Sequence, residues 1–165
     1  MIYTICKGCQ YSNGISIGSP HTGKTFQEYL VKFSKSCLTL TGVKNCDGDW
    51  NKLFGWGYGL HQRNSLRLVW KSLNGKIRIG WYVYESGVRK YDGFASVEAE
   101  ASTIMSITHD PASKNVLFKC GDKSVTWVLF ISGELIRYPL FVFVFPSHDS
   151  GLNGIIYFNL LEKHD

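Results

Sequence analysis

The clearest pattern in the chain is a pair of alternating apolar and polar runs on either side of an Asn-Gly dipeptide. One run covers residues 65–73 and the other covers residues 76–84. Asn74-Gly75 between them favours a two-residue type I′ turn, in which both central residues take positive φ. The pattern therefore predicts an antiparallel β-hairpin with the two runs paired residue by residue from the turn outward.

Because side chains alternate across a strand, this register sorts the hairpin into two faces. The first face is apolar and is predicted to lie in the core; it carries Leu66, Leu68, Trp70, Ile77, Ile79, Trp81 and Val83. The second face is basic and aromatic; it carries Ser65, Arg67, Val69, Lys71 and Leu73 opposite Tyr84, Tyr82, Gly80, Arg78 and Lys76.

Short apolar runs divided by turn residues continue through the second half of the chain. They predict strands over 103–108, 115–120, 123–131, 136–145 and 154–161. Such spacing is typical of an all-β fold, an antiparallel β-sandwich or a jelly-roll-like barrel. The stretch 47–63, rich in Gly and aromatic residues, predicts a long ordered loop. Since no repeat or linker interrupts the pattern, we expect a single domain over residues 1–165.

Composition supports strands and a bias toward anionic partners. Five Trp, nine Tyr and ten Phe accompany only four Pro, and aromatic residues favour strands. Eighteen Lys and Arg against thirteen Asp and Glu give a net charge of +5, without the clustered basic tract of an extended nucleic-acid binder.

No apolar run is long enough to span a membrane, and Met1 to Tyr11 lacks the apolar core of a signal peptide, which predicts a cytoplasmic protein.

The five cysteines predict free thiols and no metal site. Cys6 and Cys9 form a C-x-x-C pair, but Cys37 and Cys46 are not spaced as the remaining ligands of a zinc ribbon or knuckle. We therefore expect no metal and no cofactor.

A match to the phosphate-loop pattern G-x-x-x-x-G-K-[ST] occurs at Gly18 to Thr25. The residues that follow allow two interpretations: Phe26, Tyr29, Leu30 and Phe33 at helical spacing, or Tyr29, Val31 and Phe33 alternating as a strand. A nucleotide hydrolase of this type needs several parallel strands with crossover helices, and the chain shows no such pattern. We interpret the segment as a turn followed by a strand.

Three features of the basic and aromatic face indicate a binding site. Lys71 lies opposite Arg78, a like-charge pair that costs stability unless an anion or carboxylate relieves it. Gly80 removes a side chain at a point where a ligand or a neighbouring backbone could approach closely. Arg67 beside Tyr82 offers a planar donor next to an aromatic surface. The alternative is an ordinary solvated face.

The predicted ligand-binding set adds polar residues at the rim of the same face. It comprises His61, Asn64, Arg67, Lys71, Arg78, Tyr82 and Tyr84. We assign no catalytic residue, because no paired carboxylates fall on one predicted face and His148-Asp149 is explained equally well as a turn.

The residues Asn51-Lys-Leu-Phe-Gly55, with His61, Asn64-Ser65, Arg67 and Trp70 after them, resemble a family of uncharacterised proteins from bacteria and their phages. Their core motif reads N-K-L-x-G, then H-x-x-N-S-x-R-x-x-W; Gln62 replaces a second His of that motif. The resemblance extends to 35–37, 76–89 and 147–149. It implies a β-sandwich without an established activity, and its phage association implies a small protein that sequesters or degrades a host nucleotide signal.

Together these patterns predict non-enzymatic binding of a small polar or anionic ligand, with a nucleotide-like signal favoured. Two other classes stay open. One is a phosphodiesterase or glycan-active enzyme that uses His61 and His148. The other is a glycan-binding or protein-interaction module, in which Trp50, Trp56 and Tyr58 form an exposed aromatic anchor. The sequence leaves the oligomeric state open.

Overall fold

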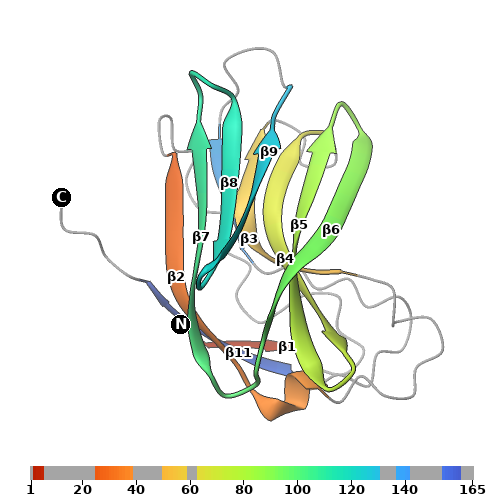
Figure 1. Ribbon diagram of the computed structural model, residues 1–165, viewed down its shortest axis with the longest axis vertical. Helices are drawn as coiled ribbons and strands as arrows, with labels where there is room; N and C mark the ends of the chain where they lie inside the picture. Colours follow the sequence, from red (N-terminus) through yellow and green to blue (C-terminus); the bar gives the residue numbers. More distant parts are fainter. Residues whose placement is uncertain are drawn as a thin grey trace.

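The computed structural model describes residues 2–5, 25–38, 50–58, 63–130, 137–141 and 154–160. In these residues two antiparallel sheets face each other, which confirms the predicted all-β sandwich (Figure 1). Within the same residues, no helix is long and apolar enough to cross a membrane.

One sheet has six strands, and its neighbours in space are far apart in the sequence. In spatial order they are β1 (Ile2–Ile5), β11 (Gly154–Leu160), β2 (Phe26–Phe33), β7 (Ser102–Asp110), β8 (Asn115–Cys120) and β9 (Lys123–Val128). The other sheet has five strands: β10 (Arg137–Phe141), β3 (Asn51–Tyr58), β4 (Ser65–Leu73), β5 (Lys76–Glu85) and β6 (Val88–Val97). A 3-10 turn, η1 (Lys35–Leu38), follows β2.

The predicted hairpin is confirmed in type and in register. Asn74 and Gly75 have φ of 51° and 72°, as a type I′ turn requires. Ser65 pairs with Tyr84 at one end, and Leu73 pairs with Lys76 at the other. The apolar face lies in the core as predicted: Leu66, Leu68, Trp70, Ile77, Ile79 and Val83 are fully buried, and the partly buried Trp81 packs against them.

The core between the sheets is closed by aromatic contacts. Trp70 of β4 meets Phe33 of β2, with ring centroids 5.2 Å apart, and Phe54 of β3 meets Tyr29 of β2 at 4.7 Å. Burying one such side chain stabilises the fold by roughly 1.5–3 kcal/mol. These contacts pack one face of the five-stranded sheet against the six-stranded sheet.

The strand after the phosphate-loop match supports the interpretation as turn and strand. Residues 26–33 form β2, with buried and half-buried residues in strict alternation. A phosphate loop is instead followed by a helix. Residues 18–24 themselves lie outside the described residues.

Two elements of the five-stranded sheet differ from the sequence prediction. The loop predicted over 47–63 is wrong for its central part, because residues 51–58 form β3. A register shift between Lys52 and Phe54 places Leu53 and Phe54 both in the core, so the alternation that marks a strand is broken there. β6 was not predicted either, since most of its side chains are exposed and polar.

Candidate functional site on the outer face of the five-stranded sheet

The outer face is the side of the five-stranded sheet that points away from the core. By register it carries Lys52 on β3; Ser65, Arg67, Val69 and Lys71 on β4; Arg78, Gly80, Tyr82 and Tyr84 on β5; and Arg89, Tyr91, Gly93 and Ser96 on β6. Trp50, directly before β3, packs on the same face against Val69 and Tyr82. The face therefore combines five cations with four aromatic rings.

Trp50 fills the gap that Gly80 leaves. Gly80 lies opposite Gly93 in the register, and the Trp50 indole lies across both. A Cβ atom added at Gly80 would stand 2.9 Å from Trp50 Cη2, and one added at Gly93 would stand 3.0 Å from it. The sequence predicted that a ligand or a neighbouring backbone approaches Gly80 closely; the group nearest to Gly80 is the Asp92 backbone carbonyl, and the Trp50 side chain comes next.

The like-charge pair of Lys71 and Arg78 is confirmed in register, and the two cations make separate contacts. Lys71 Nζ lies 4.6 Å from the centroid of the Trp50 ring, a cation–π contact. The Arg78 guanidinium donates to the Gly93 carbonyl oxygen at 3.3 Å. These contacts relieve part of the repulsion without a negative charge.

The centre of the outer face is buried. Arg67 and Tyr82 are each 4% exposed, and Trp50 is 6% exposed. Lys52 Nζ lies 4.7 Å from the centroid of the Tyr82 ring. Burial raises the pKa of Tyr82 well above its ordinary value, because the phenolate is poorly solvated there. Of the predicted site residues, Arg67 and Tyr82 thus form a base layer, while Lys71, Arg78 and Tyr84 keep access to solvent.

Asn64 has a structural contact at one end of this face. Its Oδ1 accepts a hydrogen bond from the Ser86 backbone N–H at 2.9 Å, and the Arg63 carbonyl oxygen accepts from the Gly87 N–H at 2.8 Å. Both bonds tie the start of β4 to the turn between β5 and β6. His61, predicted beside Asn64, lies outside the described residues.

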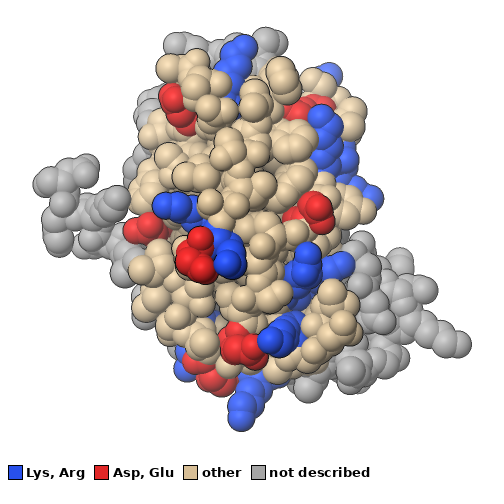
Figure 2. Space-filling view, in the orientation of Figure 1, with Lys and Arg blue, Asp and Glu red and all other residues tan. Residues whose placement is uncertain are grey.

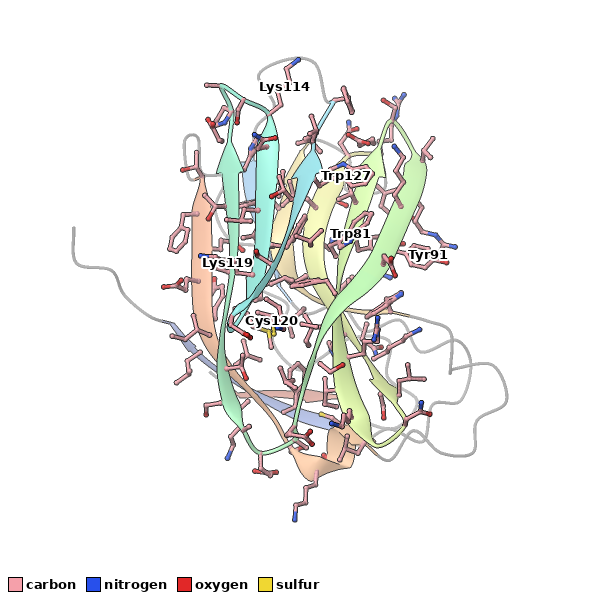
Figure 3. All side chains as sticks on the ribbon, viewed as in Figure 1. Trp81, Tyr91, Lys114, Lys119, Cys120 and Trp127 are labelled. Atoms are coloured by element: carbon pink, nitrogen blue, oxygen red, sulfur yellow. The ribbon has the colours of Figure 1, made fainter. Side chains whose placement is uncertain are left out.

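Two residues that the sequence interpretation missed, Arg89 and Tyr91, extend the face onto β6. Arg89 lies opposite Tyr84, and Tyr91 lies opposite Tyr82. Tyr91 is 44% exposed and points out from β6, whereas Trp81 and Trp127 lie between the sheets (Figure 3). Its ring stacks on Tyr82 with centroids 5.8 Å apart and planes 15° apart. The Ser86-Gly87 turn was the sequence signal that could have placed β6 beside β5.

The charge on this face is one-sided. Glu85 and Asp92, the nearest acidic residues of these strands, fall by register on the opposite face, where Glu85 pairs with Lys90 at 3.1 Å. Among the described residues, no ion pair joins a carboxylate to Lys71, Arg78 or Arg89. Figure 2 shows Lys and Arg side chains recurring along the side of the molecule formed by β5 and β6.

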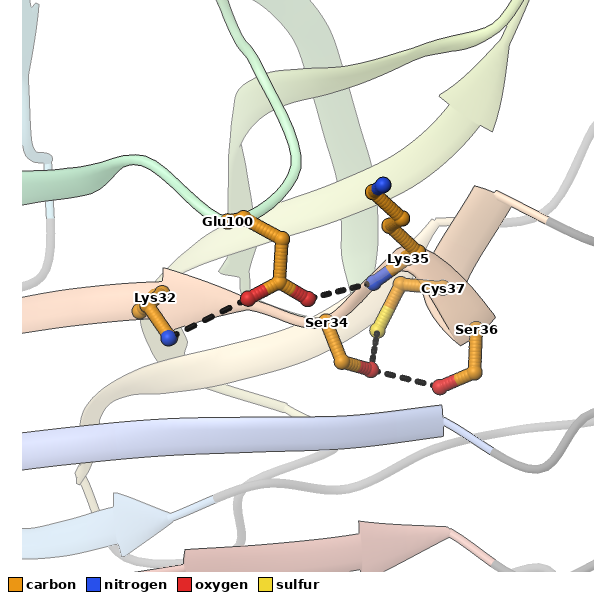
Figure 4. A network of polar contacts seen from close by, with 6 residues as sticks. All are labelled: Lys32, Ser34, Lys35, Ser36, Cys37 and Glu100. Carbon is orange, nitrogen blue, oxygen red and sulfur yellow. Dashed lines mark hydrogen bonds and ion pairs between the residues drawn. The ribbon is translucent and has the colours of Figure 1, made fainter.

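A second polar cluster, around η1, is structural. The Glu100 carboxylate pairs with Lys32 at 3.1 Å and accepts from the Lys35 backbone N–H at 3.0 Å (Figure 4). Both hydrogen bonds lower the pKa of Glu100. The Ser34 hydroxyl contacts Ser36 and the buried thiol of Cys37. The cluster fixes the exit of β2 and leaves no side chain aimed at a ligand.

Other predicted functional groups are placed only in part. Within the described part of the chain, no three His, Cys, Asp or Glu side chains gather as metal ligands. His148 and Asp149 lie outside that part. The exposed aromatic anchor is wrong for Trp50 and Trp56, because both are buried; the first covers the glycine pair and the second lies in the core.

No family model matches the chain, and no curated protein matches its sequence. Among solved structures, the Ruminococcus gnavus IT-sialidase CBM40 is 12% identical with a TM-score of 0.48, over 96% of this chain and 90% of that one. The same module bound to α2,3 sialyllactose is 13% identical with a TM-score of 0.47, over 97% of this chain and 90% of that one. The carbohydrate-binding module CBM66 from Bacillus subtilis is 8% identical with a TM-score of 0.41, over 90% of this chain and 76% of that one. These similarities are too distant to transfer a ligand or a binding residue.

Proposed function

We propose that the protein binds a small anionic or polar ligand on the outer face of the five-stranded sheet, without catalysing a reaction. The observation that carries this proposal is the set of Lys71, Arg78 and Arg89, none of which pairs with a carboxylate among the described residues. The half-buried ring of Tyr84 and the exposed ring of Tyr91 lie beside them. Cations beside aromatic rings suit phosphate or carboxylate groups attached to a ring.

A nucleotide-like signal is the favoured ligand, in line with the phage-type sequestration that the sequence resemblance implies. Guanidinium groups bind phosphate through paired N–H donors, and tyrosine rings stack on bases. Among the described residues, the outer face offers these groups but no carboxylate that could act as a general base. Catalysis through His61 and His148 stays a prediction.

Glycan binding is the second candidate, and one observation favours it. The Tyr91 ring is exposed and is backed by the nearly parallel ring of Tyr82, which makes a flat platform suited to the face of a sugar. A glycan would need less of the positive charge that Lys71, Arg78 and Arg89 supply. A neutral sugar therefore separates the two candidates.

A thermal-shift screen of the full chain tests the proposal. We would use AMP and a cyclic dinucleotide as anionic nucleotides, glucuronate as an anionic sugar, and adenosine and lactose as neutral counterparts. A ligand at a hundred times its Kd adds about 2.7 kcal/mol, which for a domain of this size raises the melting temperature by roughly 5–10 °C. We expect such shifts with anionic probes only. Shifts with lactose alone would favour the glycan candidate, and no shift with any probe would contradict the proposal.

A further inference from the structure

On β4, β5 and β6, one register row of the outer face places a side chain with a hydrogen-bond donor at each position. Ser65 of β4 lies opposite Tyr84 of β5, which lies opposite Arg89 of β6. Neighbouring strands are about 4.8 Å apart, so the three backbones span ~10 Å. A ligand of this length would contact Tyr84 and Arg89 directly, and it would reach the buried Ser65 hydroxyl once the groups that cover it move aside.

The Ser65 hydroxyl is the most unusual member of this row. It is fully buried, and its Oγ has no hydrogen-bond partner. Buried polar groups in native proteins are nearly always satisfied by the protein, by water or by a ligand. Because Ser65 alternates with the core residue Leu66, its side chain is directed to the outer face, beside Tyr84. A ligand group that accepts a hydrogen bond from Ser65 Oγ would give this buried hydroxyl the partner that it lacks.

Tyr84 and Arg89 are linked through Tyr82. The Arg89 guanidinium lies close enough to the Tyr82 hydroxyl for this interaction to raise the pKa of Arg89, and the Tyr82 hydroxyl donates to the Tyr84 hydroxyl oxygen at 3.4 Å. Hydrogen bonds in a chain polarise one another, so the Tyr84 O–H, at the end of the chain, becomes a better donor. Arg89 has five N–H groups, and no described carboxylate pairs with it.

The row is also held in place before any ligand arrives. The bonds from Ser86 N to Asn64 Oδ1 and from Gly87 N to the Arg63 carbonyl oxygen tie the start of β4 to the β5–β6 turn directly beside the row. Donors fixed in this way lose little conformational freedom when a ligand binds. Lys71 and Arg78, at the opposite end of the face, contact the Trp50 ring and the Gly93 carbonyl, and Arg89 likewise lies over the Tyr91 ring, 5.2 Å from its centroid.

We infer that the row of Ser65, Tyr84 and Arg89 binds the oxyanion of the ligand, a carboxylate or phosphate monoester carried on a hydroxylated ring. This inference rests on the proposed function and narrows it, because it assigns the negative charge to this row and leaves Lys71 and Arg78 a secondary role. The Tyr91 ring, two residues beyond Arg89, lies beside the row for stacking. A sugar acid and a nucleoside monophosphate share this chemistry.

The experiment is calorimetric titration of the full chain with AMP and with glucuronate, and adenosine and glucose serve as neutral counterparts. Arg89→Ala removes the charge of the row, while Tyr84→Phe and Ser65→Ala remove one hydroxyl each. Lys71→Ala removes a cation at the other end of the face, and Lys119→Ala removes an exposed cation from the six-stranded sheet. Circular dichroism checks that each variant is folded.

We expect Arg89→Ala to weaken binding of the anionic probe by roughly 10- to 100-fold, and each hydroxyl deletion to weaken it by roughly 3- to 10-fold. Lys71→Ala should weaken it less than Arg89→Ala does, and Lys119→Ala should leave it unchanged. Whichever probe binds identifies the source, AMP for a nucleotide and glucuronate for a sugar acid. In addition, Ser65→Ala should raise the melting temperature of the free protein by about 2–4 °C, since it removes an unsatisfied buried hydroxyl.

The outcomes separate the two proposals. If Lys71→Ala abolishes binding of the anionic probe and the three row variants do not change it, the oxyanion row is wrong while the proposed function stands. If neither AMP nor glucuronate binds the wild-type protein, the oxyanion row is wrong; the proposed function is wrong as well only if no probe of the thermal-shift screen binds. A purely structural Ser65 would lower stability when replaced and leave affinity unchanged, the reverse of the expected result.

Discussion

The two faces of the β4–β5 hairpin are made by the same alternating residues, yet they are completed in different ways. The inner face is apolar, and the six-stranded sheet covers it through contacts such as Phe33 with Trp70. The outer face combines cations with aromatic rings, and Trp50, from outside the hairpin, lies across its glycine pair. The inner face is closed by packing, with the Trp70 indole N–H buried without a hydrogen-bond partner, whereas the outer face keeps cations that no described carboxylate pairs with. This difference is the basis for assigning stability to one face and for proposing ligand binding at the other.

The largest effect is expected on the inner face. Trp70 is fully buried against the opposite sheet, so Trp70→Ala should lower the free energy of unfolding by about 3–5 kcal/mol. Trp81 is only partly buried and stacks on Trp127 at 4.7 Å, so Trp81→Ala should cost less. Urea denaturation followed by fluorescence measures both. Equal stability of Trp70→Ala and wild type would show that the faces are assigned the wrong way round.

High pH also acts on the inner region, through Cys120. Burial raises the pKa of its thiol from 9.0 to about 11. A folded pKa above the unfolded one means that the contribution is present below pH 9 and is lost as the pH rises toward 11. Between pH 8 and pH 10.5 we expect wild type to lose about 2 kcal/mol more than Cys120→Ala does. Denaturation curves of both proteins at the two pH values provide the test, and parallel losses would contradict it.

On the outer face, the glycine pair should tolerate no side chain while its neighbours are present. A Cβ at Gly93 would clash with Arg78 Nε and would lie 3.0 Å from Trp50 Cη2. Gly93→Ala should therefore cost about 1–3 kcal/mol. Most of this cost should disappear in the Arg78→Ala background, since the tightest contact is then gone. A double-mutant cycle by chemical denaturation measures the coupling; additive effects would mean that the strain lies in the backbone instead.

The smallest effect concerns the like-charge pair. Arg78→Glu makes the pair with Lys71 attractive, which is worth up to about 1 kcal/mol across a strand pair, but it also removes the hydrogen bond to the Gly93 carbonyl. We expect the stability of the free protein to change by less than about 1 kcal/mol, while affinity for an anionic probe falls. A loss of several kcal/mol in urea denaturation would instead show that Arg78 mainly supports the sheet.

The hairpin could be predicted in detail because its determinants are local. The turn Asn74-Gly75 sets the pairing, and alternation then assigns each side chain to a face. β3 could not be recognised from alternation, because its bulge places Leu53 and Phe54 both in the core. β6 lacks an apolar face of its own over most of its length, so periodicity alone could not identify it.

The candidate site was predictable only for the residues that the hairpin itself supplies. The five residues that the hairpin supplies lie on one face as predicted: Arg67, Lys71, Arg78, Tyr82 and Tyr84. Arg67 and Tyr82 are buried, however, and the other three are accessible to solvent. That division depends on Trp50, whose position over Gly80 and Gly93 is a tertiary contact without a periodic signal. Arg89 joins this face because β6 pairs with β5. The residues that determine this pairing do not belong to the hairpin.

The most direct test of an anion-binding outer face compares two charge reversals of equal size. Arg78→Glu with Arg89→Glu changes the outer face, while Lys114→Glu with Lys119→Glu makes the same change in net charge on the six-stranded sheet and its β7–β8 turn. Calorimetric titration measures the Kd of the anionic probe that gives the largest thermal shift with wild type. We predict a loss of affinity of about 100-fold or more for the first pair and less than about 3-fold for the second. Equal losses for the two folded variants, or none for the first, would contradict binding at this face.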